Sequence, residues 1–260
     1  MDPICRTPCD GQTAVTDRFL TALAFLTRIP VRNASGTPEA IGQSTSMFPL
    51  IGALVGAAEV LVLWVCRRAI PPTLTAAVIV LTGILLTGAL HLDGLADMAD
   101  GFFGGQTRDD VLSIMRDHQI GTYGAIALLM MLVLQISAIA NLVERDVAGR
   151  FLVVAPAASR WAMVLMGRRL PYARSDAGLG RALTDHVHNR EVCTSTVLVL
   201  AIATGLARAS GILSLAIILP ITAGVGAICR RRIGGITGDT LGANAVLCET
   251  IVFVAAVAQS

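Results

Sequence analysis

The sequence contains no lysine, and every one of its 20 basic residues is an arginine. This absence excludes a phosphate-binding loop that ends in Gly-Lys and any mechanism that passes through a lysine Schiff base. Charged residues make up only 15% of the chain and aromatic residues 4%, whereas about a quarter of a soluble domain is charged. The six cysteines are scattered and form no Cys-x-x-Cys pair, so no zinc site is predicted.

Apolar residues, by contrast, are abundant: they form 54% of the chain, and the mean hydropathy is +0.71. An α-helix needs roughly 20 apolar residues to cross a bilayer, and several runs approach that length. We therefore predict an all-α fold, a polytopic integral membrane helical bundle with about seven transmembrane helices. The predicted spans are 47–66, 72–90, 122–143, 151–167, 195–207, 211–229 and 241–258.

The amino-terminal region differs from the rest of the chain. Residues 1–18 carry charges and prolines without an apolar core or a small-residue cleavage pattern, which indicates a polar, disordered tail and not a cleaved signal peptide. The next run, 19–27, is too short to cross a bilayer and is cut by Arg28 and Pro30, so we expect a short interfacial or re-entrant helix. Residues 19–260 are then expected to form a single helical membrane domain.

The distribution of arginine predicts the orientation of the chain, because loops on the cytoplasmic side of a membrane are enriched in positive charge. If the loop 91–121 is cytoplasmic, the same side collects 14 arginines and the opposite side five, with Arg160 inside a span. This bias places the amino terminus and the loops 91–121, 168–194 and 230–240 in the cytoplasm. We therefore expect a multi-pass protein of the cell (inner) membrane whose polar loops face the cytoplasm.

Three aspartates, Asp93, Asp97 and Asp100, follow closely on the predicted span 72–90. If that helix continues, steps of four and three residues place the three carboxylates on one narrow face. Carboxylates that close repel one another unless a cation joins them, and an all-oxygen ligand set suits magnesium, calcium or manganese. The alternative is a solvated acidic helix end, which the four glycines of the stretch 94–105 weaken because each is unfavourable inside a helix.

Polar residues elsewhere in the three loops offer further chemistry. Arg116 is suited to clamp a phosphate and Asp117 to bind a metal or move a proton, although both residues can equally mark a membrane interface. Arg174 also suits phosphate, although basic residues beside a span satisfy the orientation rule or bind anionic lipid. Asp239 begins the last predicted span, where it acts either in a site or as a helix cap. Together the loops predict a basin for phosphoryl or phosphodiester transfer.

Four polar side chains lie inside the predicted spans, and they are Glu59, Arg160, Asn244 and Glu249. Such groups are expensive at apolar depth unless they pair with one another or line a wet cavity. Because intramembrane carboxylates also line ion paths, a transporter or divalent-cation channel is the competing class. Against it, the aspartates crowd one face, and no pair of matching broken spans suggests inverted repeats.

The motifs resemble, in type and order, those of the adenosylcobinamide-GDP ribazoletransferase family, the cobalamin synthases of bacteria and archaea. The resemblance rests on the stretches 48–52, 91–101, 114–124 and 234–243, and it covers residues 19–249. It implies that adenosylcobinamide-GDP and α-ribazole, or α-ribazole 5′-phosphate, are joined to give adenosylcobalamin, or its 5′-phosphate, with release of GMP. It also implies Mg2+ as the metal. The apolar composition predicts the lipid bilayer as the surroundings, and we expect no nucleic acid as a partner.

The resemblance further implies roles for individual residues. Asp93, Asp97 and Asp100 would bind Mg2+, and one of them would take the proton of the ribazole hydroxyl. For the phosphates and for positioning of the metal or substrates, the candidates are Arg116, Asp117, Arg174 and Asp239. The aspartate motif is also similar in part to that of the CDP-alcohol phosphotransferases, but the second half of their longer pattern is missing.

Overall fold

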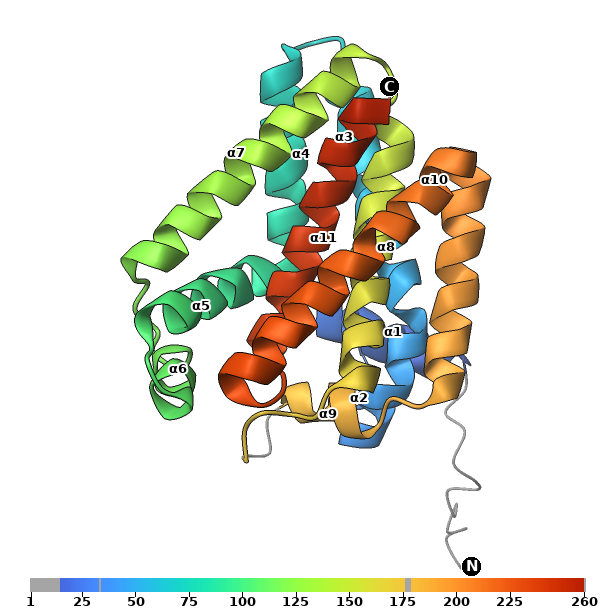
Figure 1. Cartoon of the computed structure of the whole chain (residues 1–260). Helices are drawn as coiled ribbons and strands as arrows, with labels where there is room; N and C mark the ends of the chain where they lie inside the picture. The colour runs from blue at the N-terminus through green and yellow to red at the C-terminus, as the bar shows by residue number, and fades with distance from the viewer. Residues whose placement is uncertain (1–14, 33, 176–178, 260) are drawn as a thin grey trace, which may run out of the picture.

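The computed structural model describes residues 15–32, 34–175 and 179–259, and every regular element in this part of the chain is helical (Figure 1). The predicted all-α fold is therefore confirmed for these residues. In chain order the elements are α1 (Val15–Leu26), α2 (Pro38–Ser44), the 3-10 turn η1 (Thr45–Met47), α3 (Phe48–Cys66), α4 (Pro72–Thr87), α5 (Leu90–Gly104), α6 (Arg108–Ile114), α7 (Thr122–Glu144), α8 (Ala148–Arg169), α9 (Leu179–Asp185), α10 (Asn189–Ile233) and α11 (Gly238–Gln259).

Four helical stretches in the described residues are long and apolar enough to cross a membrane, namely Pro38–Cys66, α7, α10 and α11. The helices α4 and α5 are long and apolar enough to cross a membrane only when they are taken together as one bent span. The number of candidate spans is therefore four or five. The membrane character is thus supported, whereas the predicted count of about seven is not confirmed. Part of the difference between the two counts comes from α10, because this one helix contains two of the predicted spans, 195–207 and 211–229. It bends sharply between them at Arg208 (φ 50°, ψ −125°).

The helix α8 lies in the middle of the bundle, where it packs against α3, α10 and α11. Two glycines allow α3 to approach it closely: a Cβ at Gly52 would lie 2.3 Å from the carbonyl oxygen of Pro156, and one at Gly56 would lie 2.1 Å from that of Leu152. Most residues of α8 are buried, including Arg160. Protein neighbours surround this helix on most sides, which explains how it tolerates a charged residue in its centre.

The predicted continuation of the span 72–90 into the aspartate motif is wrong. The helix α4 ends at Thr87, and Gly88 and Ala89 both adopt the left-handed conformation, with φ of 64° and 60°. The axis then turns by 90° before α5 begins. A side chain at Gly88 would collide with Arg28, whose Nε lies 2.2 Å from the position of a Cβ. The aspartates therefore lie on a separate helix, α5, which packs against α7 and α11.

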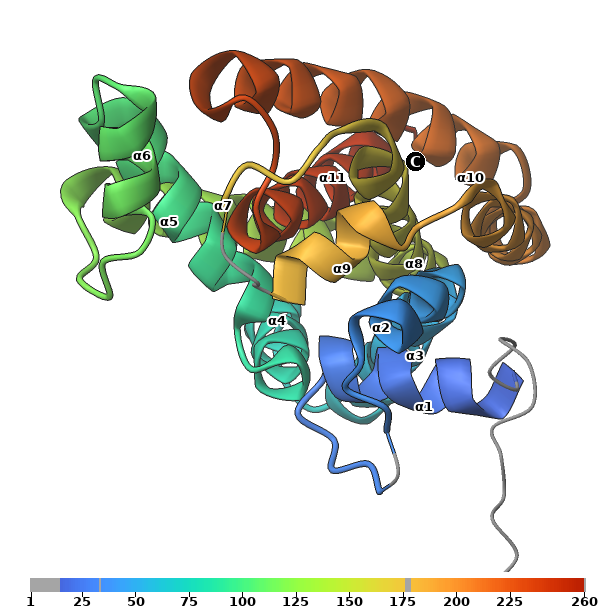
Figure 2. The same cartoon turned by 90° about the horizontal axis from the view of Figure 1, so that it is seen from below.

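The amino-terminal boundary also differs from the prediction. The helix α1 starts at Val15, so residues 15–18, assigned to the polar tail, are helical, and Arg18 is buried and donates to Gln43 (3.4 Å). The rest of the predicted tail, residues 1–14, lies outside the described residues. Seen from below, α1 runs crosswise beside α2 (Figure 2), and it packs on both α2 and α3. The run 19–27 is thus helical, as predicted, within a longer helix.

Candidate active site

The site begins with a close crossing of α5 and α11. A Cβ at Gly94 would lie 2.6 Å from the backbone oxygen of Asp239 and 2.9 Å from its Cα, so only glycine fits between the two helices without movement. A second glycine, Gly242, faces the backbone of His91 at the same crossing. These contacts place the first turn of α11 directly against the aspartate motif of α5.

A cavity of about 530 Å3 opens beside this crossing. It receives side chains from all three of the loops that the sequence predicted as functional. The predicted site residues that line it are Asp93, Asp97, Arg116, Asp117, Arg174 and Asp239. Its volume is within the range of small-molecule sites. Six of the seven candidate residues thus share one hollow, although they come from three separate parts of the sequence.

Asp239 faces this cavity and does not cap its own helix. Arg174 donates to Asp239 Oδ2 (3.0 Å) and to the carbonyl oxygen of Met115 (3.3 Å), and Thr237 Oγ1 also donates to Asp239 Oδ2 (3.2 Å). The start of α11 is capped instead by Thr237, whose hydroxyl accepts from the backbone N–H of Thr240 (3.3 Å). The interpretation of Asp239 as a helix cap is therefore wrong, and its carboxylate is available for the cavity.

The cavity has an excess of negative charge. The carboxylates of Asp239, Asp93 and Asp100 repel Asp97, and the guanidinium of Arg174 attracts it. In phosphoryl-transfer sites, Mg2+ is bound by one or two carboxylates together with water and substrate phosphates. In the described part of the chain, no three His, Cys, Asp or Glu side chains stand close enough together to hold an ion by themselves. The donor chemistry therefore fits Mg2+ bound jointly by protein carboxylates, water and substrate.

Asp100 is the predicted site residue that does not line the cavity. Its two carboxylate oxygens accept from the backbone N–H groups of Gly121 (2.7 Å) and Gly124 (2.8 Å), at the amino-terminal end of α7. A side chain at either glycine would collide with this carboxylate. Asp100 thus satisfies backbone donors that a helix start leaves without partners. The proposed role as a metal ligand stays a prediction, and the contacts shown here give Asp100 a structural task.

Other acids of the same loop serve local structure. Thr107 and Asp110 form a reciprocal capping box at the start of α6, and hydrogen bonds from the side chain and backbone of Thr107 hold the pKa of Asp110 below its ordinary value. Asp109 is exposed and pairs with Arg108 (3.3 Å). The negative charge of loop 91–121 is therefore divided between helix capping, surface pairing and the cavity.

Arg116 and Asp117 lie at the exposed rim of the cavity, immediately after α6. Asp117 Oδ1 accepts from the backbone N–H of Gln119 (3.0 Å), which shapes the turn there. Both side chains are positioned to meet a ligand entering from outside, unlike Arg174, which is mostly buried against Asp239. The two alternatives for Arg116 and Asp117, a ligand contact or an interface residue, both remain compatible with this position.

Sequence reasoning missed the arginines that join the loops. Arg108 donates to the carbonyl oxygens of Ile233 (3.0 Å) and Ala173 (2.5 Å), and Arg232 donates to those of Phe102 (2.6 Å) and Gly105 (2.8 Å). Backbone hydrogen bonds also link 171–173 to Ile236. The sequence does show arginines beside glycine-rich loops, but this pattern is equally typical of a phosphate-binding site and of arginines that join loops.

Comparison with known proteins agrees with the motifs. Residues 18–257 match the family model described as cobalamin-5-phosphate synthase. A curated adenosylcobinamide-GDP ribazoletransferase of Pseudomonas aeruginosa is 41% identical over 245 residues, which cover 91% of this chain and 96% of the relative. That of Syntrophobacter fumaroxidans is 37% identical over 243 residues, with 92% and 97% covered. No solved structure matches the chain. By the extent and level of these matches, the chain belongs to the cobalamin-5-phosphate synthase family.

Proposed function

We propose that this protein is an adenosylcobinamide-GDP ribazoletransferase, which acts in the assembly of the nucleotide loop of cobalamin. The substrates are adenosylcobinamide-GDP and α-ribazole or its 5′-phosphate, and the products are GMP and adenosylcobalamin or its 5′-phosphate. The observation that carries the proposal is the cavity in which Asp93, Asp97 and Asp239 meet Arg174. Relatives that cover almost the whole chain bear the same name.

The reaction is a displacement at phosphorus. The ribazole hydroxyl oxygen forms a bond to the phosphorus that carries cobinamide, and the bond from that phosphorus to the bridging oxygen of GMP breaks. The electron pair leaves with GMP, and the hydroxyl proton passes to a carboxylate of the cavity. Asp93, Asp97 and Asp239, together with water and the substrate diphosphate, would hold Mg2+, which would supply charge neutralisation at the diphosphate. Arg174 orients a phosphate oxygen with a charge-assisted hydrogen bond.

The cavity is large enough for the reacting groups but not for the whole substrate. At about 530 Å3, it holds the diphosphate and its immediate neighbours, and the corrin ring with its adenosyl group stays at the mouth. Arg116 and Asp117, at the rim, are positioned to contact the part that remains outside. A site that opens to the surface in this way avoids burying a very large ligand.

We also propose that the site faces the cytoplasm from the inner membrane. The excess of arginine on the side of the catalytic loops supports this orientation. A total of seven spans results if α8 and the two arms of α10 each cross the bilayer. Labelling of single cysteines introduced into loops 108–118 and 145–148 from either side of the membrane tests both statements, because the two loops should be accessible from opposite sides.

The transfer reaction is tested with purified protein, adenosylcobinamide-GDP, α-ribazole and Mg2+, by measuring release of GMP and formation of a cobamide. We expect both products in equal amounts, and we expect Asp93→Asn to abolish them while the variant remains folded in the membrane. Asp109→Asn, a substitution of an exposed aspartate in the same loop, is the matched control and should retain activity. Ion flux into liposomes without release of GMP would instead support a transporter, and release of CMP from a CDP-alcohol would support the related phosphotransferases.

A further inference from the structure

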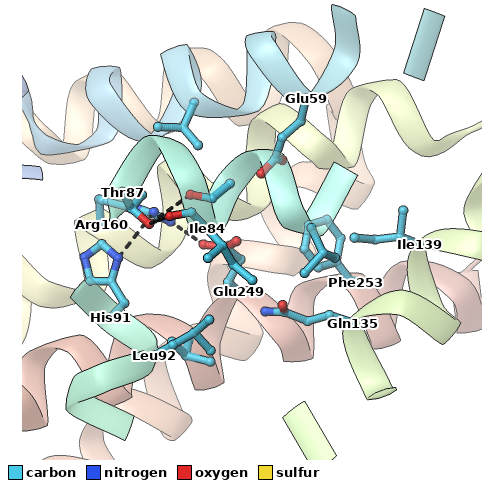
Figure 3. A pocket seen from close by; sticks show the side chains of 14 residues that line it. Glu59, Ile84, Thr87, His91, Leu92, Gln135, Ile139, Arg160, Glu249 and Phe253 are labelled. Carbon is cyan, nitrogen blue, oxygen red and sulfur yellow. Dashed lines mark hydrogen bonds and ion pairs between the residues drawn. The ribbon is translucent and has the colours of Figure 1, made fainter. Parts of the chain in front are cut away.

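A second, smaller cavity lies inside the helix bundle, apart from the proposed transfer site. Its volume is about 50 Å3, and residues from α3, α4, α5, α7, α8 and α11 surround it (Figure 3). Although the surrounding helices are apolar, the lining contains six polar side chains, and these are Glu59, Thr87, His91, Gln135, Arg160 and Glu249. A polar cavity of this size has room for a few water-sized species.

The lining of this cavity contains one arginine and two glutamates. Arg160 Nη1 donates to Glu249 Oε2, and its Nη2 lies 3.5 Å from Nδ1 of His91 (Figure 3). Arg160 Nη1 also donates to Ser159 Oγ. The guanidinium and the carboxylate of Glu249 thus form one ion pair. Glu59 adds a second carboxylate to the lining. When Glu59 is ionised, the cavity carries one negative charge in excess. An unbalanced charge inside a helix bundle is costly unless a counter-charge accompanies it.

Among the described residues, Glu59 is the carboxylate of this cavity without a hydrogen bond or close ion pair, although the charge of Arg160 acts on it. Its residue is only 4% exposed, its side chain points into the cavity (Figure 3), and it makes no hydrogen bond to any described residue. On the opposite wall, α4 approaches closely at Gly83, where a Cβ would lie 2.6 Å from Glu59 Oε1. The buried carboxylate therefore lies close to the backbone of α4 at Gly83 and lines the cavity.

The other lining groups offer oxygen atoms. Gln135 donates through Nε2 to Thr250 Oγ1 (3.0 Å), and its amide oxygen makes no hydrogen bond within the described residues. Thr87 donates its hydroxyl proton to the carbonyl oxygen of Gly83 (2.9 Å), which leaves lone pairs on Oγ1. These atoms join the carboxylates of Glu59 and Glu249 in a ligand set of oxygens only. Such a set suits a hard cation and not a transition metal.

We propose that this cavity binds one Na+ ion, with the carboxylate of Glu59 as its main ligand. One positive charge balances the excess negative charge, whereas a divalent ion would reverse it. Oxygens of Glu249, Gln135 and Thr87, with one or two waters, complete the coordination within about 50 Å3. The ion links α3, α4, α7 and α11, and so stabilises the part of the bundle next to which α5 begins.

The test uses the purified full-length protein in detergent at constant pH and ionic strength, with Mg2+ present throughout so that the transfer site is saturated. Binding of radioactive Na+ should saturate at one ion per chain. Replacing N-methylglucamine chloride with NaCl should raise the Tm by about 5 °C, with smaller effects of K+. Glu59→Gln, which removes the excess charge without changing the shape, should lose both the binding and the Tm shift.

Glu144→Gln is the matched control, because it removes a carboxylate from the exposed end of α7 and should bind Na+ like the unaltered protein. The proposal is overturned if the unaltered protein binds no Na+ and its Tm responds only to pH, since Glu59 then carries a proton. It is also overturned if Glu59→Gln binds Na+ normally, because the ion then lies elsewhere. The measurement on the unaltered protein decides the question even if the Glu59 variant does not fold.

Discussion

Gly94 sets the distance between α5 and α11, and replacing it with alanine tests whether that distance matters for transfer. The added Cβ would lie 2.6 Å from the backbone oxygen and 2.9 Å from Cα of Asp239. Both are backbone atoms, which cannot rotate away as the end of a side chain can. To reach 3.4 Å, where ordinary contact begins, the oxygen would have to retreat by 3.4 − 2.6 = 0.8 Å.

This movement separates the two parts of the proposed metal site, because Asp93 and Asp97 move with α5 and Asp239 moves with α11. A displacement of about 1 Å in an active site can cost about 100-fold in rate. We therefore expect Gly94→Ala to lower kcat for GMP release by roughly 10- to 100-fold. The Mg2+ concentration that gives half the maximal rate should rise, since fewer carboxylates reach the ion together.

The assay is GMP release by the purified variant, accompanied by a thermal unfolding curve that shows whether it is folded. Gly104→Ala is the control on the same helix, because its Cβ would meet only the Cδ1 atom of Ile114 at 3.6 Å, an ordinary contact. The control should keep its rate and its Mg2+ dependence. A folded Gly94→Ala protein with unchanged turnover would refute the reasoning, because the spacing of α5 and α11 would then be irrelevant to the reaction.

Three further substitutions separate the roles of the cavity residues. Asp97→Asn removes a negative charge from the cavity and should lower turnover by about 100- to 1,000-fold in the GMP assay with little change in Tm, and normal turnover would exclude it from the site. Arg174→Lys keeps the charge but loses the planar fork, so the KM for adenosylcobinamide-GDP should rise about 10-fold, and an unchanged KM would contradict a phosphate contact. Asp100→Ala leaves two backbone donors at α7 unsatisfied and should lower the free energy of unfolding by about 1–3 kcal/mol in denaturant titrations. If Asp100→Ala instead raises the Mg2+ requirement at unchanged stability, Asp100 is a metal ligand.

Two of the three aspartates of the motif, Asp93 and Asp97, line the cavity, whereas the helix predicted to carry them does not continue from the span 72–90. The apolar character of the run 72–90 suggested one continuous helix, and only Gly88 marked its end. A glycine just after the last turn is a common helix stop in the left-handed conformation, so the signal was present in the sequence. Ala89, which adopts the same conformation, gave no such signal, because a residue with a Cβ rarely does so. The 90° turn that follows depends on what packs around it.

The task of Asp100 was beyond prediction for a different reason. Its spacing from Asp97 is that of a neighbour on one helix face, and periodicity alone groups it with the other aspartates. What separates it is the position in space of the amino-terminal end of α7, whose N–H groups at Gly121 and Gly124 reach its carboxylate. Thr237, and not Asp239, caps α11, and the carboxylate of Asp239 contacts Arg174 and Thr237 instead. The contacts of Asp100 and of Asp239 both depend on which helix ends lie next to each other in space. The spacing of residues along the sequence does not specify this.

The basic residues of the loops 91–121, 168–194 and 230–240 are all arginines, and the geometry of the guanidinium group explains how they connect these loops. A guanidinium presents several N–H donors in a fixed plane, whereas an ammonium is a compact point charge. Arg108 uses this geometry to hold the carbonyl oxygens of Ile233 and Ala173 at once, and Arg174 uses it to hold Asp239 and the carbonyl oxygen of Met115. Each of these arginines therefore connects separate loops through hydrogen bonds from one side chain. The cavity is assembled from three distant segments because arginines of this kind connect them, and a lysine in the same place could satisfy the charge but not the geometry.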